Sequence, residues 1–103
     1  MMQTKEYDIY LPLRQQSGEE FPPDVMAWVK ETLVTECGGY THLWMPLEGA
    51  WQIHESEVMD RITILRVVDR KKGNFDIRWL KQELQAKLKE EEVLVVARDV
   101  EIL

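Results

Sequence analysis

The chain has 103 residues, the length of one domain, and its 45% hydrophobic and 31% charged residues are typical of a folded globular protein. Its net charge of −6 makes nucleic-acid binding unlikely, because an acidic chain repels phosphate backbones. No apolar run approaches the roughly 20 residues that span a bilayer, so we expect no membrane association.

The first predicted strand covers residues 7–13. Tyr7 and Ile9 alternate with Asp8 and Tyr10, and this period of two places one set of side chains on each face of a sheet. Pro12 lacks the N–H of a ladder hydrogen bond, so the strand is expected to end there or to lie at an edge.

A helix is predicted to follow, starting at residues 21–24. Proline is tolerated in a first helical turn, and Asp24 favours the positive end of the helix dipole. Glycine adopts a left-handed cap at little cost, so Gly38 and Gly39 are expected to end the helix. The side chains of its apolar stripe are Val25, Met26, Trp28, Val29, Leu33 and Cys37.

A second strand is predicted from Tyr40 to about Leu47. Gly49 suggests a bulge, residues 50–53 could continue the pairing, and the acidic residues 54–60 are expected to form the hairpin connection. Alternation divides its side chains into two sets, one of Thr41, Leu43, Met45 and Leu47, the other of Tyr40, His42 and Trp44.

The remaining elements are a strand over 61–68, a turn over 69–74, a helix from about 75 to 91 and a last strand over 93–103. Asn74 is the expected N-cap of this helix. The apolar run at 94–97 is typical of a buried central strand. The stripe of the second helix is formed by Ile77, Leu80, Leu84 and Leu88.

This order, β-α-β-β-α-β, predicts a single α+β domain over 1–103 with the ferredoxin-like fold. In that fold both helices cover one face of a four-stranded antiparallel sheet with spatial strand order 4-1-3-2. Three arginines fall on predicted strands, and an inward-pointing arginine needs a carboxylate partner, with a bound anion as the alternative. The arginines are Arg61, Arg66 and Arg98, and the possible carboxylates are Asp8, Asp99 and Glu101.

The other face of such a sheet stays open. We expect Tyr40, His42 and Trp44 on this open face, together with Asp8 and Tyr10. Aromatic side chains there would form a large exposed patch, which usually marks an interaction site. The simplest cover is a second copy of the chain, giving a homodimer or higher oligomer. The alternative is that loops or an extension of the same chain cover the face.

Candidate chemistry centres on His42, which with Tyr10 and Trp44 could form a polar-aromatic pocket and act as an acid or base. The alternative is a hydrogen-bonded histidine in an interface. Trp51 is a further large apolar anchor and a candidate for the same surface. The acidic residues 54–60 match no metal-binding spacing, so we predict neither a metal site nor a cofactor.

Cys37 is the only cysteine, so an internal disulfide is excluded and a reducing compartment is expected. Its position at the C-terminal end of a helix predicts an inert thiol. Residues 1–6 lack the basic and then apolar order of a signal peptide, so we predict a cytoplasmic protein.

The hairpin carries two short motifs, Gly38-Gly39-Tyr40-Thr41 and Gly49-Ala50-Trp51. With this GG-x-T and G-x-W pattern it resembles that of uncharacterised small ferredoxin-like proteins. The resemblance covers about a third of the chain and implies the fold but no activity.

Two functional hypotheses follow. The first is a non-catalytic oligomeric module that binds a small ligand or a partner protein across the open sheet face. The second is a small isomerase- or monooxygenase-like enzyme, working in a pocket between sheet and hairpin that His42, Tyr10 and Trp51 would line.

Overall fold

The structure is a computed structural model that describes residues 1–15, 18–53 and 56–103; the side chains of residues 45–49 and 51–60 also lie outside the described part. The elements, in chain order, are β1 (Met2–Pro12), α1 (Pro23–Cys37), β2 (Thr41–Ile53), β3 (Ser56–Val68), α2 (Ile77–Leu88) and β4 (Val95–Ile102).

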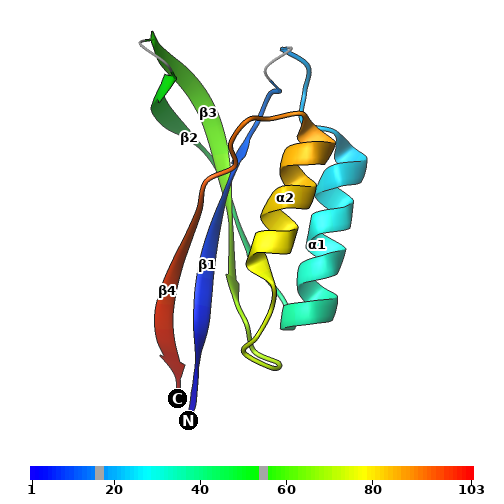
Figure 1. Ribbon diagram of the computed structural model, residues 1–103, viewed down its shortest axis with the longest axis vertical. Helices are drawn as coiled ribbons and strands as arrows, with labels where there is room; N and C mark the ends of the chain where they lie inside the picture. The colour runs from blue at the N-terminus through cyan, green and yellow to red at the C-terminus, as the bar shows by residue number, and fades with distance from the viewer. Residues whose placement is uncertain (16–17, 54–55) are drawn as a thin grey trace.

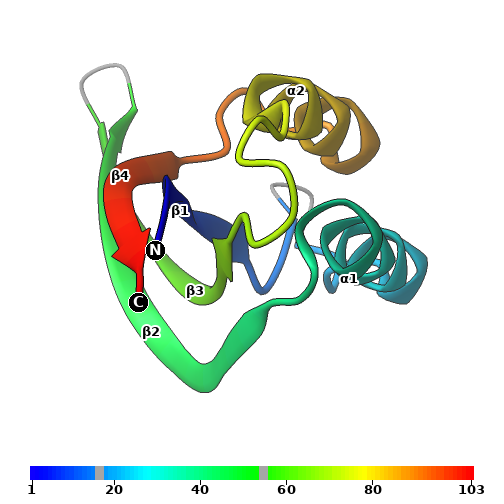
Figure 2. The ribbon, with the colours of Figure 1, turned by 90° about the horizontal axis from the view of Figure 1, so that it is seen from below.

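The four strands form one antiparallel sheet with the order β2-β3-β1-β4. Both helices lie on the same side of this sheet (Figures 1 and 2). The predicted ferredoxin-like fold is thereby confirmed. β4 lies at an edge beside β1, so the expectation of a central strand at residues 94–97 is wrong. An apolar run needs only one buried face, and here the partly buried Val95 packs against the core.

α1 has the boundaries that its sequence predicts. Pro22 is the extended N-cap residue, and Gly38 ends the helix with a φ of 98°, in the left-handed region that favours glycine. The Gly38 N–H donates to the Val34 carbonyl at 3.1 Å. Lys71, from the loop after β3, adds a hydrogen bond from its Nζ to the Thr35 carbonyl at 2.7 Å.

α2 is shorter than predicted at both ends. Asp76, not Asn74, is the N-cap residue, because its carboxylate accepts a hydrogen bond from the Trp79 N–H at 3.1 Å. The helix ends at Leu88, and Lys89 takes the left-handed conformation with a φ of 53°.

The core lies between the helices and the sheet. The predicted stripes of α1 and α2 meet the inward side chains of β1 and β3 there, which confirms both helical patterns. Its fully buried large side chains are Ile9, Leu11, Leu33, Leu65, Leu80, Leu84 and Leu88.

The β2–β3 hairpin is longer than predicted. β3 begins at Ser56, so much of the expected connection is strand, while residues 54–55 lie outside the described part. Backbone pairing does not depend on side-chain polarity, and this is why a polar stretch can extend a ladder. The register shift lies between Leu43 and Leu47 and not at Gly49, which pairs with Asp60. Pro46 falls in this interval and has no N–H to donate.

The register also corrects the predicted face of the β2 aromatic residues. His42 lies opposite Leu65, which belongs to the helix-side core. Directly opposite residues share a face, so His42 is on the helix side and not on the open face. The rings of Trp44 and Tyr40 also lie on the helix side. Trp44 stacks on His42, and Lys30 of α1 lies over both rings. The predicted alternation of β2 side chains between two faces is correct, but the set with His42 faces the helices and the set with Leu43 faces the open side.

Candidate functional site

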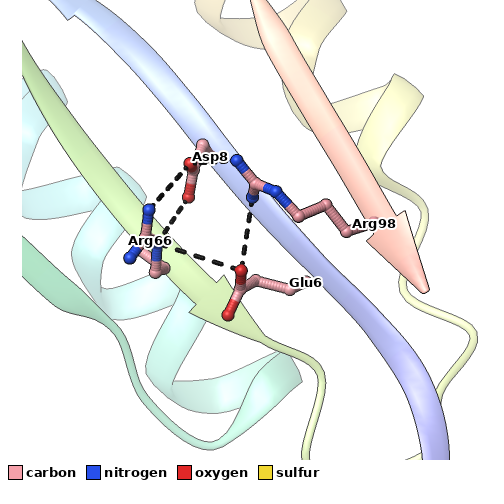
Figure 3. A network of polar contacts seen from close by, with 4 residues as sticks. All are labelled: Glu6, Asp8, Arg66 and Arg98. Carbon is pink, nitrogen blue, oxygen red and sulfur yellow. Dashed lines mark hydrogen bonds and ion pairs between the residues drawn. The ribbon is translucent and has the colours of Figure 1, made fainter. Parts of the chain in front are cut away.

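Four charged side chains from three neighbouring strands meet on the open face (Figure 3). Glu6 and Asp8 come from β1, Arg66 from β3 and Arg98 from β4. We call them the ion network. Arg66 donates to Asp8 twice, from Nε to Oδ1 at 2.8 Å and from Nη2 to Oδ2 at 3.1 Å. Arg98 donates from Nη2 to Asp8 Oδ2 at 2.9 Å.

Glu6 completes the network. It accepts from Arg98 Nη1 at 3.2 Å and lies 3.9 Å from Arg66 Nε. The prediction that arginines on strands pair with a carboxylate is confirmed for Arg66 and Arg98, and both donate hydrogen bonds to Asp8. Glu6 was missed, although its spacing of two residues from Asp8 places both on one face of a strand.

The carboxylate at the centre of the network is buried. The Asp8 side chain is 2% exposed, whereas those of Arg66 and Arg98 are 43% and 41% exposed. Hydrogen bonds from Arg66, and then those from Arg98, hold the Asp8 pKa below its ordinary value against the opposing effect of burial. Two positive and two negative groups give the network no net charge at neutral pH.

Apolar side chains lie beside the ion network on the same face. Ile64 lies opposite Tyr10 on β1 and opposite Leu43 on β2. Ile62 and Ile64 are only 6% and 7% exposed, although both helices are on the other side of the sheet. Tyr10 is therefore on the open face, as predicted.

A second cluster lies on the helix side, at the β2 edge of the sheet. We call Lys30, Tyr40, His42 and Trp44 the edge cluster. The His42 and Trp44 rings stack with centroids 4.0 Å apart and an interplanar angle of 30°. The Lys30 Nζ lies 4.7 Å from the Trp44 centroid and 5.6 Å from that of Tyr40. The contribution of Lys30 was missed, because only the tertiary packing brings α1 beside β2.

The structure separates the residues that the sequence grouped into one pocket. Tyr10 and His42 lie on opposite faces of the sheet, so they cannot line one pocket together. The backbone of Trp51 pairs with Val58, while its side chain lies outside the described residues. The pocket expected for an isomerase- or monooxygenase-like enzyme is therefore not formed in the predicted way.

The described residues also bear on metal binding and on membrane spanning. Within the described residues, no group of three His, Cys, Asp or Glu side chains could hold a metal ion. The side chains of the acidic residues 54–60, for which the sequence predicts no metal site, lie outside that part. In the ranges that the structure describes, no helix is both long and apolar enough to cross a membrane.

No family model and no curated protein matches this sequence. The resemblance of the hairpin to small ferredoxin-like proteins therefore stays a prediction. Among solved structures, a phage SAM lyase in complex with S-methyl-5'-thioadenosine is similar, with a TM-score of 0.67. The match covers 92% of this chain and 80% of that chain at 13% sequence identity. The similarity at this identity is one of fold.

Proposed function

We propose that the protein is a non-catalytic, self-associating module that binds through the open face of its sheet. The observation that carries this proposal is the apolar surface beside the ion network. Tyr10 and Leu43 are partly exposed there, beside the buried Ile62 and Ile64, and no helix lies on this side of the sheet. A face of this kind usually marks an interaction site, and a second copy is its simplest partner.

Electrostatics favours the same face. Two copies that each carry a charge of −6 repel one another, but the four charges of the ion network cancel locally. Burying a charged pair is costly unless its hydrogen bonds are already satisfied. The Asp8 carboxylate already accepts three hydrogen bonds from arginines, so a second copy can cover it without supplying a new partner.

The size of the face is also adequate. Four strands spaced about 4.8 Å apart, with a rise of about 3.3 Å for each residue of β1, give a face of roughly 700 Å². Specific interfaces bury about 800 Å² on each partner, so nearly the whole face would be covered in a dimer.

Sedimentation velocity at micromolar concentration tests the proposal. The monomer has a mass of 12.2 kDa, and we expect at least twice that value. Tyr10→Arg on the open face should shift the mass toward the monomer. Trp79→Arg, on α2, replaces another partly exposed aromatic residue and should not. A monomeric wild-type protein, or a folded Tyr10→Arg variant of unchanged mass, would contradict the proposal.

A second candidate function rests on the similar fold of the phage SAM lyase. Under this alternative the protein is a small enzyme, or a binding protein, for SAM or a related thioether nucleoside. Incubation with SAM followed by chromatography would detect S-methyl-5'-thioadenosine, and calorimetry would measure binding of that nucleoside. Neither product nor binding is expected if the protein is only a self-associating module.

A further inference from the structure

The edge cluster presents an unusually exposed aromatic surface. Trp44 is 74% exposed and Tyr40 is 37% exposed, while most tryptophans are largely buried. The indole of Trp44 is held by stacking on His42 and by the Lys30 ammonium. Aromatic faces beside a cation attract planar rings, and this surface is on the opposite side of the sheet from the ion network.

Hydrogen bonds fix the imidazole beneath Trp44 in one tautomer. The Thr63 hydroxyl donates to the Leu43 carbonyl at 2.7 Å, so its proton is already used. His42 Nε2, 2.9 Å from the Thr63 hydroxyl oxygen, must therefore be the donor of that hydrogen bond. In the neutral form of His42, Nδ1 therefore carries a lone pair.

This Nδ1 is a buried acceptor without a donor in the described part of the protein. Buried polar atoms in native proteins usually have a hydrogen-bond partner, and exceptions often occur at functional sites. Burial, and then the charge of Lys30, lower the His42 pKa, which keeps the imidazole neutral and Nδ1 able to accept.

Lys30 supplies the charge of the cluster. Across the described ranges, no carboxylate lies within ion-pair distance of its ammonium. The Lys30 ammonium lies over the aromatic rings of the cluster instead. It can pair with the acidic group of a ligand that stacks on the neighbouring rings.

We propose that the edge cluster binds a small molecule with a planar aromatic ring system and a carboxylate or phosphate. The ring stacks on Trp44, and the acidic group pairs with Lys30. A nucleotide and an indole-type carboxylic acid share this chemistry, and the experiment distinguishes them.

Calorimetric titration with AMP and with indole-3-acetate tests the site. Saturable binding of either acid is expected, and the one that binds more tightly identifies the source of the ligand. Adenosine should bind more weakly than AMP, because it lacks the acidic group that pairs with Lys30. Inorganic phosphate should bind more weakly because it lacks the ring.

Two substitutions localise the binding. Trp44→Ala should weaken it about tenfold or more, since a stacked ring is lost. Lys30→Gln should weaken it a few-fold and reduce its dependence on salt. The matched controls are Trp79→Ala and Lys72→Gln, which change another exposed tryptophan and a lysine outside the edge cluster and should have no effect.

Circular dichroism confirms that the variants are folded, which we expect because Trp44 is largely exposed. Failure of both acids to saturate the wild-type protein at millimolar concentration would overturn the proposal. Equal losses in the Trp44 and Trp79 variants would also overturn it. Neither result depends on the sedimentation experiment, because that experiment concerns the other face of the sheet.

Discussion

Replacing Asp8 is expected to destabilise the protein more than replacing any exposed carboxylate. Asp8 is the hub that joins β3 and β4 to β1, since Arg66 and Arg98 both donate to its buried carboxylate. Asp8→Ala removes the hub, and Asp8→Asn keeps its shape but removes its charge. Asp99→Asn is the matched control, because Asp99 is 84% exposed and pairs with Lys5 at the surface.

The magnitude follows from the burial of each partner. A hydrogen bond to a charged group contributes about 1.5–3 kcal/mol, and breaking a fully buried ion pair costs about 3–5 kcal/mol. The side chains of Arg66 and Arg98 are over 40% exposed and can turn to water, so the larger figure does not apply. We expect Asp8→Ala to lower the free energy of unfolding by about 2–3 kcal/mol and Asp8→Asn by about 1–2 kcal/mol.

The effect should depend on pH with a defined sign. The pKa of Asp8 is lower in the folded protein than in the unfolded chain, so the unfolded chain takes up the proton first as pH falls. The contribution of Asp8 is complete above the unfolded pKa of about 3.9 and is lost as pH falls through the folded value. The difference between wild type and Asp8→Asn should therefore shrink below about pH 4.

Urea denaturation at one fixed protein concentration, at pH 7 and at pH 3, measures both effects. A fixed concentration is needed because self-association changes apparent stability. A loss at pH 7 no larger than that of Asp99→Asn would refute the hub role of Asp8. A difference between wild type and Asp8→Asn that stays constant with pH would refute the lowered pKa.

Three further predictions concern other buried groups. Asp69→Ala removes the acceptor for the backbone N–H groups of Lys71 and Phe75 and should cost about 2 kcal/mol in urea denaturation; an unchanged midpoint would contradict this. Burial raises the pKa of Cys37 to about 12, so its thiol should react with a disulfide reagent at pH 8 only after unfolding. His42 should titrate by NMR below its ordinary pKa of 6.5. The unfolded chain then binds that proton first, so the contribution of His42 to stability should be lost as pH falls below about 6.5.

The sequence predicted the fold because several independent local signals agreed. The end of α1 at Gly38 and the stripe of α2 each follow from a pattern within one element. The pairing of Arg66 and Arg98 with Asp8 was also foreseeable, because a charge on a strand needs a partner on a neighbouring strand.

The candidate site was less predictable because it depends on which face of β2 meets the helices. Both sets of β2 side chains contain apolar residues, Leu43 in one set and Trp44 in the other, so alternation alone does not distinguish the faces. The register with β3 decides, since it places His42 opposite Leu65. That register changes between Leu43 and Leu47, and no local pattern located the change there.

The pairing of β1 with β4 has a mechanical consequence. Met2 lies opposite Ile102, so the two ends of the chain meet at one end of the sheet (Figure 1). Antiparallel ladder bonds run perpendicular to the strands, and a force that separates the termini therefore loads them one pair at a time. β4 should therefore separate from β1 at low force, one hydrogen-bonded pair after another. The resistance should rise when the force reaches the bonds of Arg98 to Glu6 and Asp8.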